Sequence, residues 1–320
     1  MKILAVDDDQ MMLNLLQETM GFAGFSDVTL ADSAVEAAQI IAEANPPFDC
    51  MFIDFKMPEI NGDYLCTWVR NLPQYQTTPL VMVTALGQKP DIDRAFAAGA
   101  TDYITKPVDL ADLIARLKLL ARQVAQLKAD AAAAPQKETT PDPDQALTRI
   151  DFTKPMHLGG IKGEIDLASL ENYLVQISRN SIHEMSAFSF AIKDAAKLHL
   201  VCSRKGFIAI LKATGRAIST HLETPNFFIA YAGYGTFTGV IESKNIDENE
   251  REALEATVRK SLDGITVASR NGAPSKIEPY MAMPRKLGTW SGTKVVDAMY
   301  HTIGEAEDRC KAIITGAAAS

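Results

Sequence analysis

Short apolar runs alternate with amphipathic stretches over the first 130 residues of the chain. The apolar runs have strand length and fall at 3–6, 28–31, 50–53, 80–84 and 103–105. The stretches between them have helical spacing and lie at 10–20, after the candidate caps Asp32 and Ser33, after Gly62, at 90–98 and after Pro107. Short apolar strands without alternation are typical of a parallel sheet buried on both faces. The strict alternation of strand and helix therefore predicts an α/β domain with a doubly wound, five-stranded parallel sheet.

Residues 150–316 have a different order of elements. A helix is predicted where Leu167, Leu170, Leu174 and Ile177 recur three or four residues apart. It is followed by a strand at 187–192, a helix at 206–222, a strand-turn-strand at 227–241, a helix at 249–262, a strand at 277–283 and a helix at 294–303. The two apolar strands within 227–241 are joined by a glycine turn, which predicts a β-hairpin. Together these elements predict an α+β domain.

The segment between the two halves has the composition of a linker. Residues 131–148 are rich in Ala, Pro, Thr, Asp and Gln, and such a segment offers nothing for a core. We therefore predict a first domain at 1–120, a helical stalk with a Pro/Ala-rich linker at 121–150, and a second domain at 151–320.

The helix predicted at 110–127 carries an apolar seam. Its apolar residues alternate three and four positions apart, at Leu110, Leu113, Leu117, Leu120, Val124 and Leu127. This is the spacing of a coiled-coil heptad. The positions up to Leu117 would pack on the sheet of the first domain, whereas those from Leu120 onward lie beyond its expected end. We predict a homodimer through a parallel pair of these helices. The alternative is a single amphipathic tail that folds back on the second domain.

Acidic residues stand at two strand ends of the first domain. Asp7 and Asp8 follow the first strand, and Asp54 follows the third. The carboxyl ends of parallel strands share one edge of a doubly wound sheet, which also receives Thr84 and Lys106. Three crowded carboxylates repel one another, and a divalent cation with oxygen ligands, above all Mg²⁺, relieves that repulsion. Asp54 would then act as a nucleophile toward a phosphoryl group, with Lys106 and Thr84 beside the transferred group.

The first domain resembles the receiver domain of two-component response regulators. The resemblance covers residues 2–125 and rests on the acidic pair, the strand-end aspartate, a threonine, an aromatic residue and a Lys-Pro pair, in the same order and spacing. It implies a flavodoxin-like fold in which Asp54 accepts phosphate from a histidine kinase or a phosphotransfer protein. Asp8 would bind Mg²⁺ directly and Asp7 through water, and Lys56 would offer its backbone carbonyl to the same ion.

The same resemblance implies roles for the remaining strand-end residues. Lys106 would contact the phosphoryl oxygens, and Thr84 and Tyr103 would form the pair that switches conformation. Ala85 is small, which would leave the phosphoryl group accessible. The bond between Lys106 and Pro107 would be cis.

The second domain resembles the GGDEF domain of diguanylate cyclases in its order of elements. The signature hairpin of that family corresponds to Gly233, Tyr234, Gly235, Thr236 and Phe237. Gly235 and Thr236 occupy the two acidic positions of the signature, and Tyr234 occupies its second glycine position. A cyclase needs carboxylates there to hold metal ions and to activate the attacking hydroxyl. The resemblance therefore implies a degenerate GGDEF-like domain with no catalytic residues of its own.

Three functions are compatible with this organisation. The first is a response regulator whose phosphorylation controls a non-catalytic output domain that contacts an unidentified protein target. The second is an enzyme of cyclase type that uses Asp194, Glu223 or Glu242 in place of the signature acids. The third is nucleotide binding without turnover at the glycine turn, which is a weak signal for phosphate. We favour the first, because the second half has no clustered acidic motif in its sequence.

Net charge and composition limit the kinds of partner and the cellular compartment that we expect. The net charge of -8 at pH 7 disfavours nucleic acid as a partner, because phosphate binding needs a basic face. No apolar run approaches the roughly 20 residues of a membrane span, and the first residues enter a strand directly, so we expect a cytoplasmic protein without membrane contact. The four cysteines and five histidines are scattered, without the spacing of a metal site.

Overall fold

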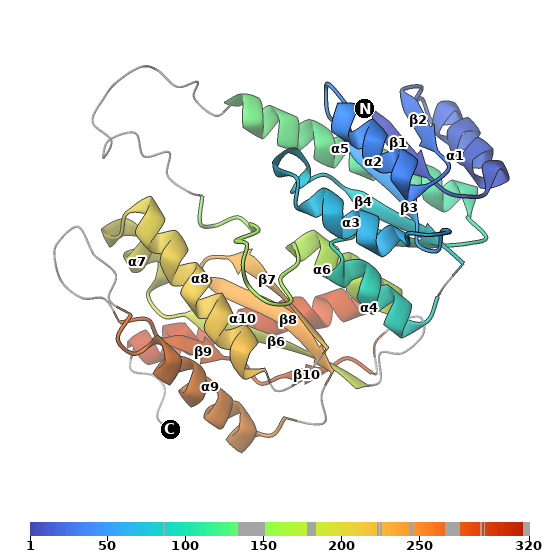
Figure 1. Ribbon diagram of the computed structural model, residues 1–320. Helices are drawn as coiled ribbons and strands as arrows, with labels where there is room; N and C mark the ends of the chain where they lie inside the picture. The colour runs from blue at the N-terminus through green and yellow to red at the C-terminus, as the bar shows by residue number, and fades with distance from the viewer. Residues whose placement is uncertain are drawn as a thin grey trace, which may run out of the picture. The chain divides into compact units, whose positions relative to one another are not determined.

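Two units make up the chain, residues 1–140 and 141–320. The structure is a computed structural model (Figure 1) that describes all residues except 86, 134–150, 178–183, 223, 225, 243–245, 266–275, 289, 291 and 316–320. It also gives the backbone but not the side chains of 127 and 130–133. Most of the predicted linker therefore lies outside the described residues.

The first unit contains a five-stranded sheet in the order β2-β1-β3-β4-β5, with all neighbours parallel. Its strands are β1 (Ile3–Val6), β2 (Val28–Ala31), β3 (Cys50–Asp54), β4 (Leu80–Thr84) and β5 (Asp102–Thr105). Its helices are α1 (Gln10–Phe22), α2 (Ala34–Glu43), α3 (Gly62–Arg70), the 3-10 turn η1 (Pro73–Tyr75), α4 (Lys89–Ala97) and α5 (Leu110–Ala133). The predicted flavodoxin-like α/β fold is confirmed, and each predicted strand agrees to within one residue.

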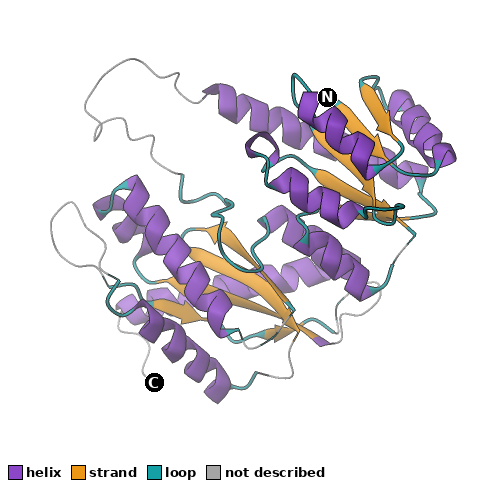
Figure 2. Ribbon diagram, viewed as in Figure 1, coloured by secondary structure: helices purple, strands orange, loops and turns teal. Residues whose placement is uncertain are grey.

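Helices cover both faces of this sheet (Figure 2), which is why its strands are almost wholly apolar. On one face, α1 and α5 pack over side chains of β1, β3 and β4 in a single core. Side chains cap the first two helices, and Ser33 is one of the two candidate caps that the sequence predicts for the second. The Asp9 carboxylate accepts the amide of Met11 at 2.9 Å, and the Ser33 hydroxyl accepts the amide of Glu36 at 3.3 Å.

Helix α5 packs on the first unit over more of its length than the sequence indicates. Leu113, Leu117 and Leu120 all lie in the core with α1, and Leu120 is only 6% exposed. The expectation that positions from Leu120 onward lie beyond the first domain is therefore wrong for Leu120, whose side chain belongs to the core of the first unit. Leu110 is exposed, so it lies off the buried seam. The side chain of Leu127 lies outside the described residues.

The second unit contains an antiparallel sheet in the order β10-β6-β8-β7, with β9 also paired to β6. Its strands are β6 (Met185–Ile192), β7 (Phe227–Gly233), β8 (Thr236–Glu242), β9 (Pro279–Met281) and β10 (Arg285–Lys286). Its helices are α6 (Leu167–Ile177), α7 (Ala195–Val201), α8 (Arg204–His221), α9 (Glu248–Leu262) and α10 (Thr293–Thr315). The order β6-α8-β7-β8-α9-β9 is a β-α-β-β-α-β arrangement, and the predicted hairpin at 227–241 is present.

Three elements of this unit differ from the sequence prediction. Helix α7 has no predicted counterpart. Helix α10 continues to Thr315, beyond the predicted end at 303, because its later buried positions are the small residues Ala306 and Cys310, which give a weak apolar signal. The strand predicted at 277–283 is shorter, since β9 covers Pro279–Met281, and Pro284 separates it from the unpredicted strand β10. Proline has no amide hydrogen for a strand ladder, which explains the break.

The two faces of β6 differ in chemistry. Phe188, Phe190 and Ile192 lie in the main core with α8 and α9. Residues between them point to the other face, as the two-residue period of a strand requires, and that face is covered by α10. There the Ser189 hydroxyl lies 3.0 Å from the Thr238 hydroxyl and 2.7 Å from the Thr302 hydroxyl of α10. Helix α10 is thus held to the sheet by a row of buried hydroxyl groups.

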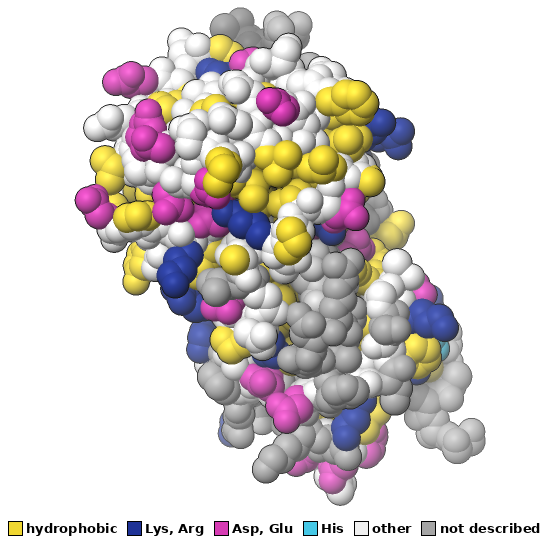
Figure 3. All heavy atoms as spheres, turned by 90° about the vertical axis from the view of Figure 1, so that its right-hand side faces the viewer, with side chains coloured by type: hydrophobic (Ala, Val, Ile, Leu, Met, Phe, Trp, Pro, Cys, Tyr) yellow, Lys and Arg dark blue, Asp and Glu magenta, His cyan; other side chains and the backbone are white. Residues whose placement is uncertain are grey.

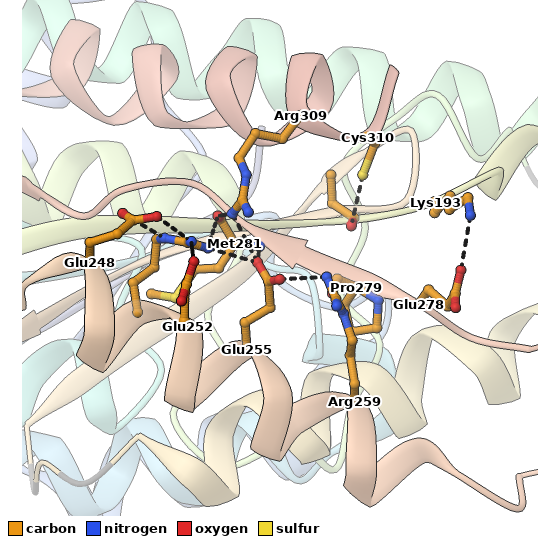
Figure 4. Close-up of polar contacts among 12 residues, drawn as sticks. Lys193, Glu248, Glu252, Glu255, Arg259, Glu278, Pro279, Met281, Arg309 and Cys310 are labelled. Atoms are coloured by element: carbon orange, nitrogen blue, oxygen red, sulfur yellow. Dashed lines mark hydrogen bonds and ion pairs between the residues drawn. The ribbon is translucent and has the colours of Figure 1, made fainter. Parts of the chain in front are cut away.

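A buried ion cluster joins α9, α10 and β9 (Figure 4). Its centre is the carboxylate of Glu255, which accepts from Arg251 at 3.0 Å, from Arg309 at 2.9 Å and from the amide of Met281 at 2.8 Å. Arg259 donates to its other oxygen. Both guanidiniums of Arg251 and Arg309 also donate to the carbonyl of Met281. We name these residues the Glu255 cluster. Every oxygen of its central carboxylate has a protein partner.

Candidate functional site

Two buried aspartates meet where β1 and β3 end. The strands are paired through Val6 and Ile53, so the residues that follow them lie side by side. Asp7 is 1% exposed and Asp54 is 4% exposed, whereas Asp8 faces solvent. One carboxylate oxygen from each of the three lies within 4.8 Å of the others. The predicted acidic cluster is therefore present at the carboxyl edge of the sheet.

Lys106 follows β5 and reaches into this cluster. Its Nζ lies 2.7 Å from Asp7 Oδ2 and 2.8 Å from Asp54 Oδ1. Its peptide bond to Pro107 is cis, as predicted. Burial raises the pKa of Asp7 and of Asp54, and the adjacent lysine offsets only part of that shift. Burial by itself would lower the pKa of Lys106, but hydrogen bonds to both aspartates outweigh it and raise that pKa.

Backbone amides hold the two buried carboxylates in place. The amide of Lys56 donates to Asp54 Oδ2 at 2.9 Å, and the amide of Asp9 donates to Asp7 Oδ1 at 3.0 Å. The Lys56 contact runs through its amide, so the role predicted for its carbonyl stays a prediction. These bonds fix each carboxylate and leave the exposed Asp8 beside them.

The cluster fits a hard divalent cation. Three carboxylates supply oxygen ligands of the kind that Mg²⁺ prefers, and a single lysine does not balance their charge. The raised pKa of the two buried carboxyls has the same cause, which is negative charge held away from solvent. Asp7, Asp8 and Asp54 are thus the residues that would hold the ion.

Thr84 and Tyr103 adjoin the cluster from the ends of β4 and the start of β5. Both are buried, and their side chains share a hydrogen bond. Burial raises the pKa of the Tyr103 hydroxyl. The carbonyl of Thr84 accepts the amide of Lys106 at 2.7 Å, which ties the two loops together. Ala85, which follows Thr84, is exposed.

Gly62 is a site residue that the sequence reading does not identify as such. It opens α3, and a Cβ at this position would collide with the carbonyl oxygen of Asp54. Its amide donates to the carbonyl of Phe55 at 2.9 Å. Glycine is needed here so that α3 can begin directly against the strand end that carries Asp54. The only sequence signal is the Asn61-Gly62 pair, which indicates a turn without showing what it approaches.

In the second unit the predicted hairpin residues form the turn between β7 and β8. Gly233, Tyr234 and Gly235 all have positive φ, at 98°, 54° and 81°. Thr236 is buried and donates to Glu307 of α10 at 3.2 Å, and Phe237 lies in the main core. The amides of the turn are engaged within the unit, since that of Tyr234 donates to the carbonyl of Phe152 at 2.7 Å.

The acidic residues considered for an alternative cyclase chemistry are not brought together. Asp194 follows the end of β6, whereas Glu242 pairs with Met185 at the start of β6. Asp194 is exposed, and Glu242 accepts a hydrogen bond from Asn226 at 2.5 Å. Glu223 lies outside the described residues. Among the described residues, the only group of three metal-binding side chains is that of Asp7, Asp8 and Asp54.

Comparison with known proteins identifies the first unit. The sequence profile of the response regulator receiver domain matches residues 3–118. Chemotaxis protein CheY1 of Helicobacter pylori is 36% identical over 107 residues, which are 33% of this chain and 86% of CheY1. The chain belongs to the response regulator receiver family. The receiver domain is the first unit described above.

Other relatives match a part of the chain. The DNA-binding dual master transcriptional regulator RpaA of Synechocystis is 32% identical over 122 residues, which are 38% of this chain. The match spans 49% of RpaA, about half of its length. The solved structure of chemotaxis response regulator CheY4 of Vibrio cholerae is 30% identical, covers 37% of this chain and 97% of CheY4, and gives a TM-score of 0.35. The profile match ends at residue 118, within the first unit.

Two further observations concern the predictions about nucleic acid and membranes. On the face drawn in Figure 3, lysine and arginine side chains lie interspersed with acidic ones. Within the part of the chain that the structure describes, no helix combines the length and the apolar character that a membrane span requires.

Proposed function

We propose that this chain is a phosphorelay response regulator in which Mg²⁺-dependent phosphorylation of Asp54 controls a GGDEF-like output unit that acts through protein contacts. The observation that carries the proposal is the cluster of three carboxylates around one lysine at the receiver's strand ends. The phosphodonor is a histidine kinase or a phosphotransfer protein, as is typical of the receiver family.

Asp54 is the proposed phosphoacceptor. Its carboxylate oxygen attacks the phosphorus of the donor phosphohistidine, a P–O bond forms, and the P–N bond of the donor breaks, which returns a neutral imidazole to the donor after proton uptake. The amide of Lys56 holds one Asp54 oxygen at 2.9 Å, which orients the carboxylate. Lys106 lies 2.8 Å from the other oxygen and is placed to follow the incoming phosphoryl group.

The neighbouring acids have a supporting role. Asp7, Asp8 and Asp54 would hold Mg²⁺, which supplies positive charge next to the transferred phosphoryl group when bound. Asp7 keeps Lys106 in place through its contact at 2.7 Å. The exposed Asp8 is the ligand through which the ion would enter from solvent.

Thr84 and Tyr103 are the proposed switch. Thr84 follows Val83, which pairs with Asp54, so its hydroxyl would lie near a phosphoryl group on Asp54. Its hydrogen bond with the Tyr103 hydroxyl couples that event to β5 and to the surface around α4 and α5. Phosphorylation thereby changes a face of the receiver that another protein or the output unit can bind.

The second unit is proposed to be GGDEF-like and non-catalytic. Its β-α-β-β-α-β order and the glycine turn of its hairpin support the first part. Gly235 and Thr236 at the acidic signature positions support the second, since neither side chain can hold a metal ion against a triphosphate. The turn amide of Tyr234 is occupied by the carbonyl of Phe152, and that of Gly235 by the hydroxyl of Tyr231 at 3.0 Å. Those amides are therefore closed to a nucleotide phosphate, which favours action through protein contacts.

Dimerisation through α5 stays a prediction, and fewer residues support it than the sequence suggests. Leu120 serves the receiver core, so the buried seam is accounted for within one chain. Leu110 and Leu119 are exposed on the same helix, but they are nine residues apart and lie on opposite faces, so a second copy would contact only one of them.

Phosphorylation of the purified chain by acetyl phosphate with Mg²⁺ tests the acceptor. The wild-type protein should gain the mass of one phosphoryl group, and Asp54→Asn should gain none, because an amide is not a nucleophile toward phosphorus. Intact-protein mass spectrometry measures the change. Asp27→Asn is the matched control, since Asp27 is exposed and precedes β2 at the other edge of the sheet. Labelling that persists in Asp54→Asn would place the acceptor elsewhere.

Incubation with GTP and Mg²⁺ tests the output unit. We expect no cyclic dinucleotide by liquid chromatography, with or without the phosphate mimic beryllofluoride, because the signature acids are missing. Any cyclic product that depends on the second unit refutes the interaction proposal, whatever the result with Asp54→Asn.

A further inference from the structure

The first described residues of the second unit contact the tip of its hairpin. The Phe152 ring stacks on the His199 ring at a centroid distance of 4.5 Å and an angle of 26°. It meets Phe207 at 6.0 Å and Tyr234 at 5.9 Å, both edge to face. These three rings come from α7, α8 and the hairpin turn. Phe152 is thus enclosed by aromatic side chains from three separate elements.

Backbone hydrogen bonds hold the same segment. The carbonyl of Phe152 accepts both the amide of Tyr234 at 2.7 Å and the hydroxyl of Tyr231 at 2.9 Å. Met156 forms an antiparallel bridge with Tyr231. We name His199, Phe207, Tyr231 and Tyr234 the hairpin cluster, and residues 151–156 the docked segment.

The glycine turn is shaped around the docked segment. A Cβ on Gly233 would collide with the carbonyl oxygen of Thr153, and a Cβ on Gly235 would collide with Ala195 of α7. The positive φ of each glycine, 98° and 81°, adds a second reason for glycine. The turn therefore keeps its glycines for a packing reason that needs no nucleotide.

The docked segment lies on the exposed side of the fold. Strand β7 is the last strand of the sheet, and its outer edge is bridged by this chain's own residues before α6 rather than by another strand. Phe152 is partly buried and packs against the main core without belonging to it. Residues 151–165 run beside β7 in Figure 1 and bridge to it at Met156 and Glu164. An aromatic anchor combined with main-chain bonds at a sheet edge is a recurring mode of peptide recognition.

We propose that the hairpin cluster and the adjoining edge of β7 form a peptide-binding site that the chain fills with its own docked segment. A partner that takes this site offers an extended segment with an aromatic side chain whose carbonyl can accept two hydrogen bonds. The docked segment competes with such a partner, so the site is closed until the segment leaves. This inference rests on the proposal that the second unit acts through protein contacts.

A synthetic peptide with the sequence of residues 150–158 tests the site in trans. Its binding is measured by fluorescence polarisation with the full-length chain and with Phe152→Ala. We expect at least tenfold tighter binding to Phe152→Ala, because the internal competitor has lost its anchor while the hairpin cluster is intact. A peptide with alanine in place of its phenylalanine should bind at least tenfold more weakly.

Control variants show whether the peptide binds at the hairpin cluster. Phe22→Ala removes an aromatic ring that is 86% exposed in the receiver domain, and it should behave as the wild type. Tyr234→Ala combined with Phe152→Ala removes an exposed wall of the hairpin cluster and should weaken peptide binding. Equal binding of the peptide to wild type and Phe152→Ala, or no binding to a folded Phe152→Ala chain, overturns the proposal.

Hydrogen exchange of the wild-type chain keeps the proposal testable if Phe152→Ala does not fold. The amide of Tyr234 should exchange through a local opening of the docked segment, insensitive to denaturant, while amides in the middle of β8 exchange through larger openings. If the Tyr234 amide exchanges only with global unfolding of the unit, the segment is an inseparable part of the fold and the proposal fails. None of these readouts requires phosphorylation, so they stand apart from the Asp54→Asn result.

Discussion

The acidic site of the receiver domain and the Glu255 cluster of the second unit bury carboxylates with opposite charge balance. At the receiver site, Asp7 and Asp54 share the single cation of Lys106, and Asp8 adds a third negative charge. In the second unit, Glu255 alone faces three guanidinium groups and a backbone amide. The first arrangement is short of positive charge, and the second is saturated with it.

The difference separates a binding site from a structural joint. A buried carboxylate needs partners, because removing charge from water is costly. Glu255 finds all of its partners within the protein and joins two helices to a strand. The receiver carboxylates do not, so an external cation can complete the set. Both regions bury carboxylates. The number of positively charged partners that the protein supplies decides whether a carboxylate binds a cation or joins structural elements.

Glu255→Gln should give the largest effect. It removes the buried negative charge that Arg251 shares with Arg309, and breaking a buried ion pair on one side costs about 3 kcal/mol of unfolding free energy. Arg251 keeps its ion pairs with the exposed carboxylates of Glu248 and Glu252. Thermal unfolding followed by Trp290 fluorescence in a Trp68→Phe background reports on the second unit. Glu252→Gln is the control, since that carboxylate pairs with the same Arg251 at 3.3 Å but is exposed to solvent, and its loss should change the unfolding free energy by less than about 0.5 kcal/mol. Equal effects of the two variants would mean that the Glu255 cluster is not a structural joint.

Asp8→Asn should give a smaller effect that depends on the ion. In a chelator it should not destabilise the receiver, because one carboxylate of a crowded set becomes neutral. Mg²⁺ at ten times its dissociation constant should stabilise the wild-type receiver by about 1.4 kcal/mol, and Asp8→Asn should lose most of that gain. Calorimetric unfolding with and without Mg²⁺ measures both quantities.

Asp9→Asn is the control for that experiment. Asp9 is adjacent in sequence, but its carboxylate caps α1 through the amide of Met11, and asparagine caps equally well. The Mg²⁺ response should therefore survive in Asp9→Asn. If Asp8→Asn destabilises the receiver in a chelator as much as Glu255→Gln destabilises the second unit, the contrast between the two regions disappears.

The receiver fold and most of its site could be predicted from the sequence. Buried parallel strands are short apolar runs, so β1, β3 and β4 are visible as such, and the doubly wound topology then gathers Asp7, Asp54 and Lys106 at one edge. The role of Gly62 could not be predicted, because it depends on how closely α3 approaches the carbonyl of Asp54. The close approach of two backbone segments produces no hydrophobic pattern that could be recognised in a single sequence.

The second unit was predictable in its elements and less so in its contacts. The hairpin glycines are visible, but the docking of Phe152 on the turn joins residues far apart in the chain. Arg251 and Glu255 have the helical spacing of an ion pair, whereas the contribution of Arg309 depends on how α10 lies. The end of α5 was misjudged for a related reason, since only packing reveals that Leu120 reaches the receiver core.

The hydroxyl row beneath α10 determines how that helix can settle on its sheet. Sliding α10 by one turn would break the hydrogen bond between Thr302 and Ser189, at a net cost of about 0.5–1.5 kcal/mol. A purely apolar interface would tolerate such a shift of the helix better, because apolar contacts are interchangeable. The hydroxyl pair therefore favours the observed alignment of α10, which also places Glu307 beside Thr236 and Arg309 beside Glu255.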